Sequence, residues 1–238
     1  MLQVQEGVNA MASGLVWSAV MLSLVLASIT TAILLAVATP IAWWLVRSAW
    51  RGKEAVAAIV SLPLVLPPTV LGFYLLLLFG PYGPGGALAG LWGGRTLAFS
   101  FPGLVIGSVI YSLPFMVQPL RNAFEAIGDE PLEAAATLGA SSAQRFWRVA
   151  VPLGRSGYLA GAILTFAHTV GEFGVVLMIG GNIPGQTKVL SIAIYDAVEQ
   201  LNWGEAHILA IGMVIFAFVA ISLMTLADRR TTRGVPSP

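Results

Sequence analysis

Long apolar stretches separated by short polar intervals constrain this chain more than any other feature of its sequence. Five stretches are each long enough to cross a bilayer, for which a helix needs about 20 mainly apolar residues. Backbone polar groups inside a bilayer must be satisfied within the segment, so such spans form helices. We therefore predict an all-α, polytopic membrane protein that forms one domain over residues 1–238, with spans at 15–46, 55–79, 97–120, 157–180 and 207–227.

The composition excludes several classes of protein. Charged residues make up 10% of the chain, whereas about 25% of a soluble domain is charged. The chain has no cysteine, which excludes disulfides and cysteine-ligated metals. It contains no phosphate-binding loop of the Gly-x4-Gly-Lys-Ser/Thr type and no recognisable nucleophile motif, so it cannot hydrolyse ATP itself and an enzyme is not indicated. We expect no cofactor, no metal and no nucleic-acid ligand.

The distribution of basic residues predicts the orientation of the chain in the membrane. Of the twelve Lys and Arg residues, only Arg95 and Lys188 fall on one side of the five predicted spans. Basic residues are enriched in cytoplasmic loops. We therefore expect the interval at 121–155 and the C-terminus to be cytoplasmic, and the N-terminus to lie outside the plasma or inner membrane of a bacterium or archaeon. The ten residues on the cytoplasmic side are Arg47, Arg51, Lys53, Arg121, Arg145, Arg148, Arg155, Arg229, Arg230 and Arg233.

The polar interval at 121–155 predicts two short helices joined by a tight bend. Gly139 follows the last apolar residue of the first helix, as a helix-ending glycine does. Ser141 and Gln144 have the spacing of a capping box that opens the second helix. Pro152 is expected to end that second helix. Acidic residues suit the positive N-terminal end of a helix, and three stand at the start of the first one: Asp129, Glu130 and Glu133.

Three interpretations of this interval compete. The spacing Ala135-x3-Gly139 before an apolar run also occurs in DNA-binding helix-turn-helix motifs, but a place between two membrane spans argues against that function. An ordinary amphipathic loop is the second interpretation. The third is a resemblance: Glu-Ala-Ala-x3-Gly139, then nine residues, then Val149-Ala-Val-Pro152, resembles the cytoplasmic coupling loop of type I ABC importer permeases, which prefer Ile-x-Leu-Pro at its end. The resemblance implies that this loop docks into a cleft of an ATPase subunit through Glu133, Ala134, Ala135, Gly139 and Pro152.

Two predicted spans contain residues that suit either a transport path or helix packing. In the second span, Pro67 and Pro68 interrupt backbone hydrogen bonding, which a bilayer tolerates only beside protein or a water-filled cavity. In the fourth, His168 and Glu172 stand four residues apart and so share one face of a helix. A charged residue at mid-membrane costs about 2.5–3.5 kcal/mol on insertion scales. We expect His168 to be the partner of Glu172, either as a structural pair or as part of a gate.

Further motifs narrow the resemblance to importers of oxyanions. The run Phe166-Ala-His-Thr-Val-Gly-Glu-Phe-Gly174 resembles Phe-Ala-Arg-x-x-Gly-Glu-Phe-Gly of that group, with His168 where Arg is usual. The runs Leu62-Pro-Leu-Val-Leu-Pro-Pro68 and Gly181-Asn-Ile-Pro-Gly185 resemble the molybdate branch. The resemblance covers roughly residues 18–227, which is nearly the whole chain.

The resemblance implies a permease that carries molybdate or tungstate across a lipid bilayer, with molybdate as its main cargo. Its implied partners are a second copy of the chain, two copies of an ABC ATPase and a periplasmic oxyanion-binding protein. A sulfate or thiosulfate importer permease is the alternative within the family. Two alternatives lie outside the family. A secondary oxyanion transporter would need coupling-ion residues in several spans. For a structural membrane protein, deletion of the gene is expected to cause no transport defect.

Overall fold

The fold is entirely helical over the residues that the structure describes. The computed structural model describes residues 2–91 and 93–232, with side chains over 14–91 and 93–226. All regular elements in these ranges are helices. The prediction of an all-α membrane protein is therefore confirmed. Three helical segments are long and apolar enough to cross a membrane, namely Gly14–Arg47, Phe101–Ile127 and Trp203–Leu226, and there are up to five if each of two bent helix pairs counts as one span.

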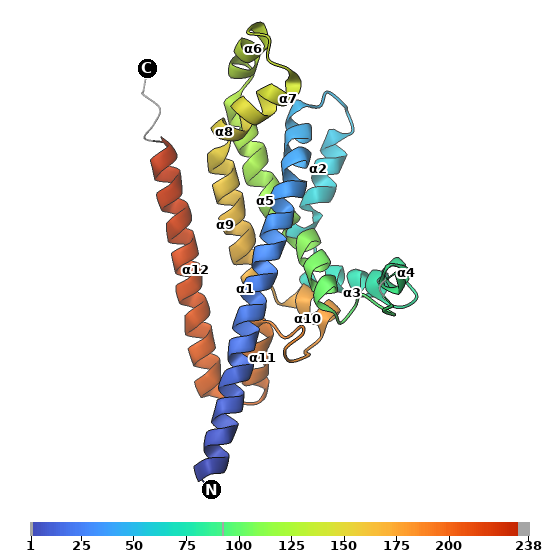
Figure 1. Ribbon diagram of the computed structural model, residues 1–238, viewed down its shortest axis with the longest axis vertical. Coiled ribbons are helices and arrows are strands. Elements are labelled where there is room, and N and C mark those ends of the chain that lie inside the picture. The colour runs from blue at the N-terminus through green and yellow to red at the C-terminus, as the bar shows by residue number, and fades with distance from the viewer. Residues whose placement is uncertain (1, 92, 233–238) are drawn as a thin grey trace.

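Three helices pack together to form the centre of the molecule. They are α1 (Leu2–Arg47), α5 (Phe101–Ile127) and α9 (Arg155–Gly171), and each contacts the other two (Figure 1). The buried side of α1 is rich in small side chains, which let helix backbones approach closely in a membrane. The small buried residues of α1 are Ala19, Ser23, Ala27, Thr30, Ala38, Thr39 and Ala42.

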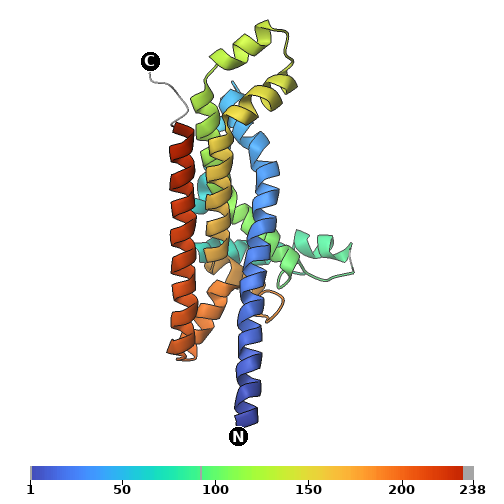
Figure 2. The same cartoon turned by 60° about the vertical axis from the view of Figure 1, so that its left-hand side comes forward.

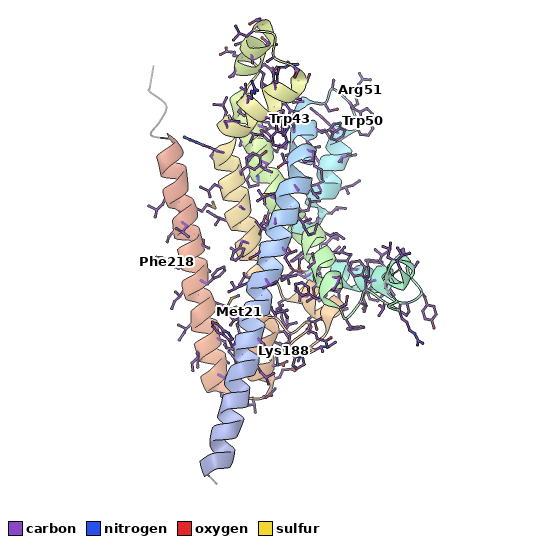
Figure 3. All side chains as sticks on the ribbon, in the orientation of Figure 1. Met21, Trp43, Trp50, Arg51, Lys188 and Phe218 are labelled. Atoms are coloured by element: carbon purple, nitrogen blue, oxygen red, sulfur yellow. The ribbon has the colours of Figure 1, made fainter. Side chains whose placement is uncertain are left out.

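Helix α12 (Trp203–Thr232) lies along α9 at the side of this centre (Figure 2). Most of its apolar side chains are exposed, and Phe218 has 72% of its surface accessible. Met21 on α1 also points outward from the middle of the molecule (Figure 3). Exposed apolar side chains along these long helices suit contact with lipid, since the interior of a bilayer favours apolar surface.

The predicted second span is broken rather than continuous. It consists of α2 (Lys53–Ser61), a 3-10 turn (Leu62–Leu64) and α3 (Pro68–Phe79), and the chain bends by 106° between the two arms. Pro67 has extended backbone (φ −54°, ψ 133°), as a residue before a proline prefers, so α3 starts in a new direction. Helix α3 and the short α4 (Pro84–Gly90) project sideways from the body as an arm (Figure 1).

The predicted fourth span is also interrupted, so the expectation of one helix over 157–180 is wrong. Helix α9 ends at Gly171, Glu172 is extended (φ −64°, ψ 130°), and α10 starts anew over Gly174–Gly180. After α10, the chain forms another short helix, α11 (Leu190–Glu199). Glycines on both sides of Glu172 lower the cost of leaving the helix, and the sequence pattern alone did not reveal the break.

The third predicted span is shifted toward the C-terminus. Helix α5 starts at Phe101, because Ser100 caps it: the Ser100 Oγ accepts a hydrogen bond from the backbone N–H of Gly103 at 3.2 Å. The helix then continues seven residues beyond the predicted end at Leu120, to Ile127. The first part of the predicted polar interval at 121–155 therefore belongs to α5, and this helix extends beyond the apolar stretch.

Candidate functional site: a coupling loop and a junction of broken helices

The predicted pair of short helices forms at one end of the molecule. Helix α6 (Glu130–Thr137) is followed by Gly139, whose φ of +84° is a left-handed conformation that favours glycine. Helix α7 (Ser142–Arg145) opens with the predicted capping box: the Ser141 Oγ accepts from the N–H of Gln144 at 3.3 Å, and the Gln144 Oε1 accepts from the N–H of Ser141 at 2.8 Å. The helix, bend and capping box are confirmed. We call residues 128–154 the coupling loop, after the loop of importer permeases that their sequence resembles.

The coupling loop has an anchored side and an open side. Leu132 of α6 is buried in a cluster of apolar side chains that also contains Phe124 of α5. Glu133, Ala134 and Gly139 are exposed, and Ala135 is half-buried. Leu138, beside the bend, has 88% of its surface exposed. Single exposed apolar side chains are common on protein surfaces, and the sequence analysis did not single Leu138 out.

The second helix of the loop does not end at Pro152, contrary to the prediction. The chain passes from α7 through a π-helical turn (Phe146–Ala150) into α8 (Val151–Leu153) and bends only at Gly154, by 67°, into α9. A proline lacks the N–H of a helical hydrogen bond and clashes with the carbonyl four residues earlier. The wider π turn places that carbonyl elsewhere, so Pro152 is accommodated inside the helix.

The two interrupted helices meet inside the molecule. A Cβ built on Gly174, at the start of α10, would lie 2.7 Å from the Cβ of Pro68, at the start of α3. The corner at Pro67 and Pro68 therefore packs against the break that follows Glu172, and only a glycine fits there. Pro67 and Pro68 are both exposed on the other side of this contact. The structure thus brings three predicted path residues, Pro67, Pro68 and Glu172, to one junction of broken helices.

His168 and Glu172 do not pair, so that prediction is wrong. His168 Nδ1 lies 2.9 Å from the Oγ of Ser112, and its ring stacks on Phe115 with centroids 3.9 Å apart. The Glu172 side chain is 3% exposed, and neither of its carboxylate oxygens has a hydrogen-bond partner among the described residues. The pairing fails because α9 ends at Gly171: without a helical turn between the two residues, they no longer share a face.

A polar cluster surrounds these residues between α5 and α9. The Ser112 Oγ lies 3.0 Å from the Thr169 Oγ1, which donates to the carbonyl oxygen of Thr165 at 2.9 Å. Ser108 Oγ, like the Glu172 carboxylate, is buried without a hydrogen-bond partner among the described residues. Nowhere in the described part of the chain do three His, Asp or Glu side chains gather as a metal site requires. The cluster therefore provides polar contacts between α5 and α9.

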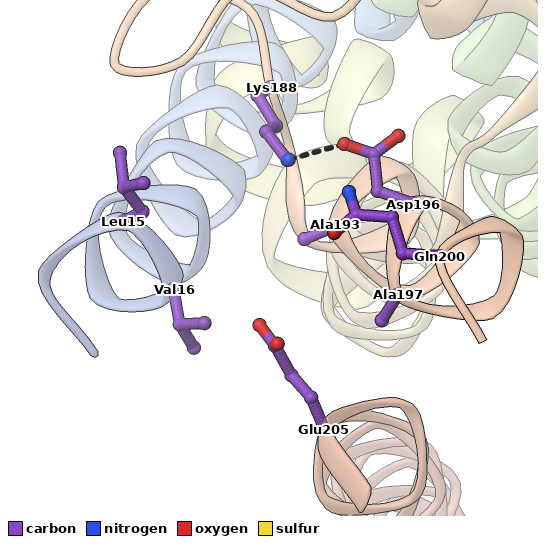
Figure 4. Close-up of a pocket in the computed structure, with 8 residues that line it drawn as sticks. All are labelled: Leu15, Val16, Lys188, Ala193, Asp196, Ala197, Gln200 and Glu205. Atoms are coloured by element: carbon purple, nitrogen blue, oxygen red, sulfur yellow. Dashed lines mark hydrogen bonds and ion pairs between the residues drawn. The ribbon is translucent and has the colours of Figure 1, made fainter. Parts of the chain in front are cut away.

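The Asn182–Gly185 motif forms a loop that is bonded to α11, at the opposite end of the molecule from the coupling loop. The Asn182 amide donates to both Asp196 carboxylate oxygens at 2.7 Å, and Lys188 forms an ion pair with Asp196. The Thr187 Oγ1 donates to the carbonyl of Gly180 at 2.6 Å. A small pocket between α1, α11 and α12 exposes Lys188 and Asp196, with Glu205 opposite (Figure 4). The motif therefore fastens the loop and does not form a cage for an anion.

Comparison with known proteins identifies the group to which this arrangement belongs. The model of the family described as binding-protein-dependent transport system inner membrane component matches residues 28–233. The chain belongs to this family. It is accordingly a multi-pass protein of the inner, or plasma, membrane, and its relatives are transport permeases.

Permeases of this family from several organisms resemble the chain over nearly its whole length. The molybdenum transport system permease protein ModB of Azotobacter vinelandii is 59% identical over 218 residues, which are 92% of this chain and 96% of that protein. ModB of Escherichia coli K12 is 36% identical over 87% of this chain and 90% of its own length. The sulfate transport system permease protein CysW of Synechocystis is 32% identical, over 96% of this chain and 82% of its own.

Solved structures show the same fold at lower identity. The MetNI methionine ABC transporter in an inward-facing conformation matches with a TM-score of 0.70 at 17% identity, over 94% of this chain and 98% of that one. A bacterial alginate ABC transporter matches with a TM-score of 0.68 at 18% identity, over 91% and 78%. A second alginate structure, in complex with an alginate pentasaccharide-bound periplasmic protein, has a TM-score of 0.67 at 17% identity, over the same shares. The predicted ABC importer permease fold is confirmed.

Proposed function

We propose that this chain is the membrane-spanning subunit of an ATP-driven importer whose cargo is molybdate. The observation that carries the proposal is the 59% identity with the Azotobacter vinelandii molybdenum permease over 92% of the chain. Two sulfate permeases of Synechocystis share 32% and 36%, far below that 59%, so the molybdate branch is favoured over the sulfate branch. Tungstate, a tetrahedral dianion of similar shape, is expected to follow the same path.

An ATPase subunit is the partner that the coupling loop suits. The loop exposes Glu133, Ala134 and Gly139 around the bare side chain of Leu138, while Leu132 holds α6 on the body. Such a surface combines an apolar contact with a rigid, capped backbone. Ala135 and Pro152 belong to the same surface in the proposal, which has the ATPase bind here and pull the loop during its cycle.

A second copy of the chain is the proposed partner of the lateral arm. The arm formed by α3 and α4 packs on α10 through α3, projects sideways from the body and exposes Phe73, Tyr74, Leu77 and Leu88. Each chain has one coupling loop, and the proposed importer has two ATPase subunits. Two copies of the chain are therefore needed to bind both ATPases, and a symmetric dimer is expected. Native mass spectrometry of the detergent-extracted complex is expected to give two permeases and two ATPases; a complex with one permease would contradict the dimer.

The proposed orientation places the coupling loop in the cytoplasm. Trp43, Trp50 and Arg51 lie near the end of the molecule that carries this loop, whereas Lys188 lies near the other end (Figure 3). Tryptophan is enriched at both interfaces of a membrane, and it is the basic residue that favours the cytoplasmic side for this end. A reporter fused after Pro238 should be active only if it works in the cytoplasm, and activity of a periplasmic reporter there would reverse the orientation.

The junction of the broken helices is the proposed path for cargo. Pro67 and Pro68 are exposed beside the break at Glu172, and interrupted helices of transporters often line such paths. Because the Glu172 carboxylate is almost fully buried, it does not present its charge to a passing dianion. In this proposal Glu172 and His168 keep the junction in shape beside the path, and the weak polar lining lets an anion leave quickly.

The test of the proposed function is uptake of labelled molybdate by cells that lack this gene. High-affinity uptake at trace concentration is expected to disappear, and sulfate uptake to remain. Complementation with the intact chain provides the control. Uptake that continues in the deletion strain would refute the assignment. Uptake that depends on the chain but survives depletion of ATP would indicate a secondary transporter instead.

A further inference from the structure

One arginine fastens the inner end of α1 to the entrance of the coupling loop. Arg47 is the last residue of α1, and its guanidinium forms an ion pair with Asp129. Its Nη2 also donates to the carbonyl oxygen of Gly128 at 2.8 Å. Gly128 and Asp129 are the two residues between α5 and α6. A single side chain from the first span therefore binds both residues of the turn that starts the coupling loop.

An aromatic cluster beneath Arg47 links the same helix to both sides of the loop. The guanidinium carbon of Arg47 lies 5.2 Å from the ring centroid of Trp43, within the range of cation–π contact. Trp43 in turn meets Phe124 of α5 edge-on at 5.3 Å and Phe146 of the π turn at 5.1 Å. These centroid distances are typical of stabilising aromatic pairs. The end of α1 thus contacts both α5, which precedes the coupling loop, and the π turn in the second half of the loop.

The geometry of these contacts is better suited to fixing the position of the turn at Gly128 and Asp129 than to stabilising the whole fold. The Asp129 side chain is 74% exposed, and an ion pair in that setting adds little to global stability. The Arg47 side chain is 25% exposed and is held by three different neighbours. A planar guanidinium that contacts an acid, a carbonyl and a ring restricts the direction of all three.

We propose that Arg47 is a positioning residue of the transport cycle, which fixes the turn at Gly128 and Asp129 to the end of α1. When the ATPase displaces the coupling loop, α1 then moves with it, in addition to α5 and α9, which are joined to the loop through the backbone. This inference rests on the proposed function. It extends the coupling machinery from the loop to the first span of the chain.

Hydrogen exchange of the assembled complex tests the contact itself. Arg47→Met removes the guanidinium and keeps an unbranched stem over Trp43, while Arg51→Met removes the same charge from an exposed turn nearby and is the matched control. We expect amides of Glu130–Thr137 to exchange about five-fold faster in Arg47→Met, the factor that corresponds to about 1 kcal/mol. Asp129→Asn should shift them in the same direction, and Arg51→Met should leave them unchanged. Equal exchange in wild type and Arg47→Met overturns the proposal.

The ratio of ATP hydrolysed to molybdate imported tests the role in the cycle. In proteoliposomes, Arg47→Met is expected to raise this ratio several-fold, because ATP-driven loop movement reaches α1 less completely. Arg47→Lys keeps a charged donor but loses the planar fork, so it is expected to restore only part of the coupling. A wild-type ratio in Arg47→Met, even with faster exchange, overturns the positioning role. If the wild-type complex imports no molybdate with ATP, the proposed function fails, and the exchange experiment still decides whether Arg47 fixes the turn.

Discussion

Replacing Gly139 with alanine isolates the backbone of the coupling bend. Gly139 has a φ of +84°, and a Cβ added there would meet no atom within 4 Å. Steric contact therefore contributes nothing, and the whole effect comes from the left-handed conformation. That conformation costs a residue with a Cβ about 1–2 kcal/mol, and asparagine tolerates it better than alanine.

The expected size of the effect follows from the populations of the bend. A cost of about 1–2 kcal/mol lowers the equilibrium constant between the docking conformation and the other conformations of the bend by a factor of about 5–30. When only the docking conformation binds, the apparent affinity for a partner falls by up to that same factor, which is reached when the docking conformation becomes the minor one. Gly139→Ala is therefore expected to weaken binding of the proposed ATPase by up to roughly 30-fold, and Gly139→Asn by less.

Binding of purified ATPase to the permease in lipid nanodiscs measures this directly. Gly204→Ala is the matched control, because a Cβ there also meets no atom within 4 Å and Gly204 lies in the first turn of α12, at the other end of the molecule. The expected order of affinity is wild type and Gly204→Ala first, then Gly139→Asn, then Gly139→Ala. Wild-type affinity in Gly139→Ala, or weaker binding by Gly139→Asn than by Gly139→Ala, refutes the reasoning.

Two further predictions concern the junction in the membrane, and thermal unfolding in detergent checks both. His168→Leu removes the contact with Ser112, costs about 1 kcal/mol and lowers Tm by about 2–4 °C; an unchanged Tm would mean that this contact is not formed. Gly174→Val forces a side chain against Pro68 and costs about 1–3 kcal/mol, whereas Gly212→Val on α12 meets open space and should be neutral. Equal Tm values for these two valine variants would contradict the close packing of α3 on α10.

The features that the sequence predicted well are local ones. Gly139, Ser141 and Gln144 interact within a few residues, so their spacing is enough to predict the bend and the capping box. Pro67 and Pro68 likewise predicted an interruption, because a proline restricts the residue before it. The two prolines do not predict the direction that α3 takes after the interruption, because that direction depends on the packing of α3 against α10.

The features that the sequence analysis missed depend on residues far apart or on a weak local signal. The contact of Arg47 with Gly128 joins residues 81 positions apart, and no periodicity encodes it. The break at Glu172 lies in an apolar run with glycines at 171 and 174, a composition that continuous membrane helices also have. The spacing of His168 and Glu172 predicts a pair only if the helix continues through both residues, and the helix ends at Gly171.

Competition for uptake by the reconstituted complex tests the central proposal most directly. The permease, its ATPase and its binding protein are placed in proteoliposomes with labelled molybdate and ATP. Molybdate, tungstate and sulfate are all tetrahedral dianions, so size and hydrogen-bond geometry must separate them. We predict ATP-dependent uptake that excess tungstate suppresses and equal sulfate leaves intact. Sulfate that competes as well as tungstate would contradict the molybdate assignment and indicate the sulfate branch of the family.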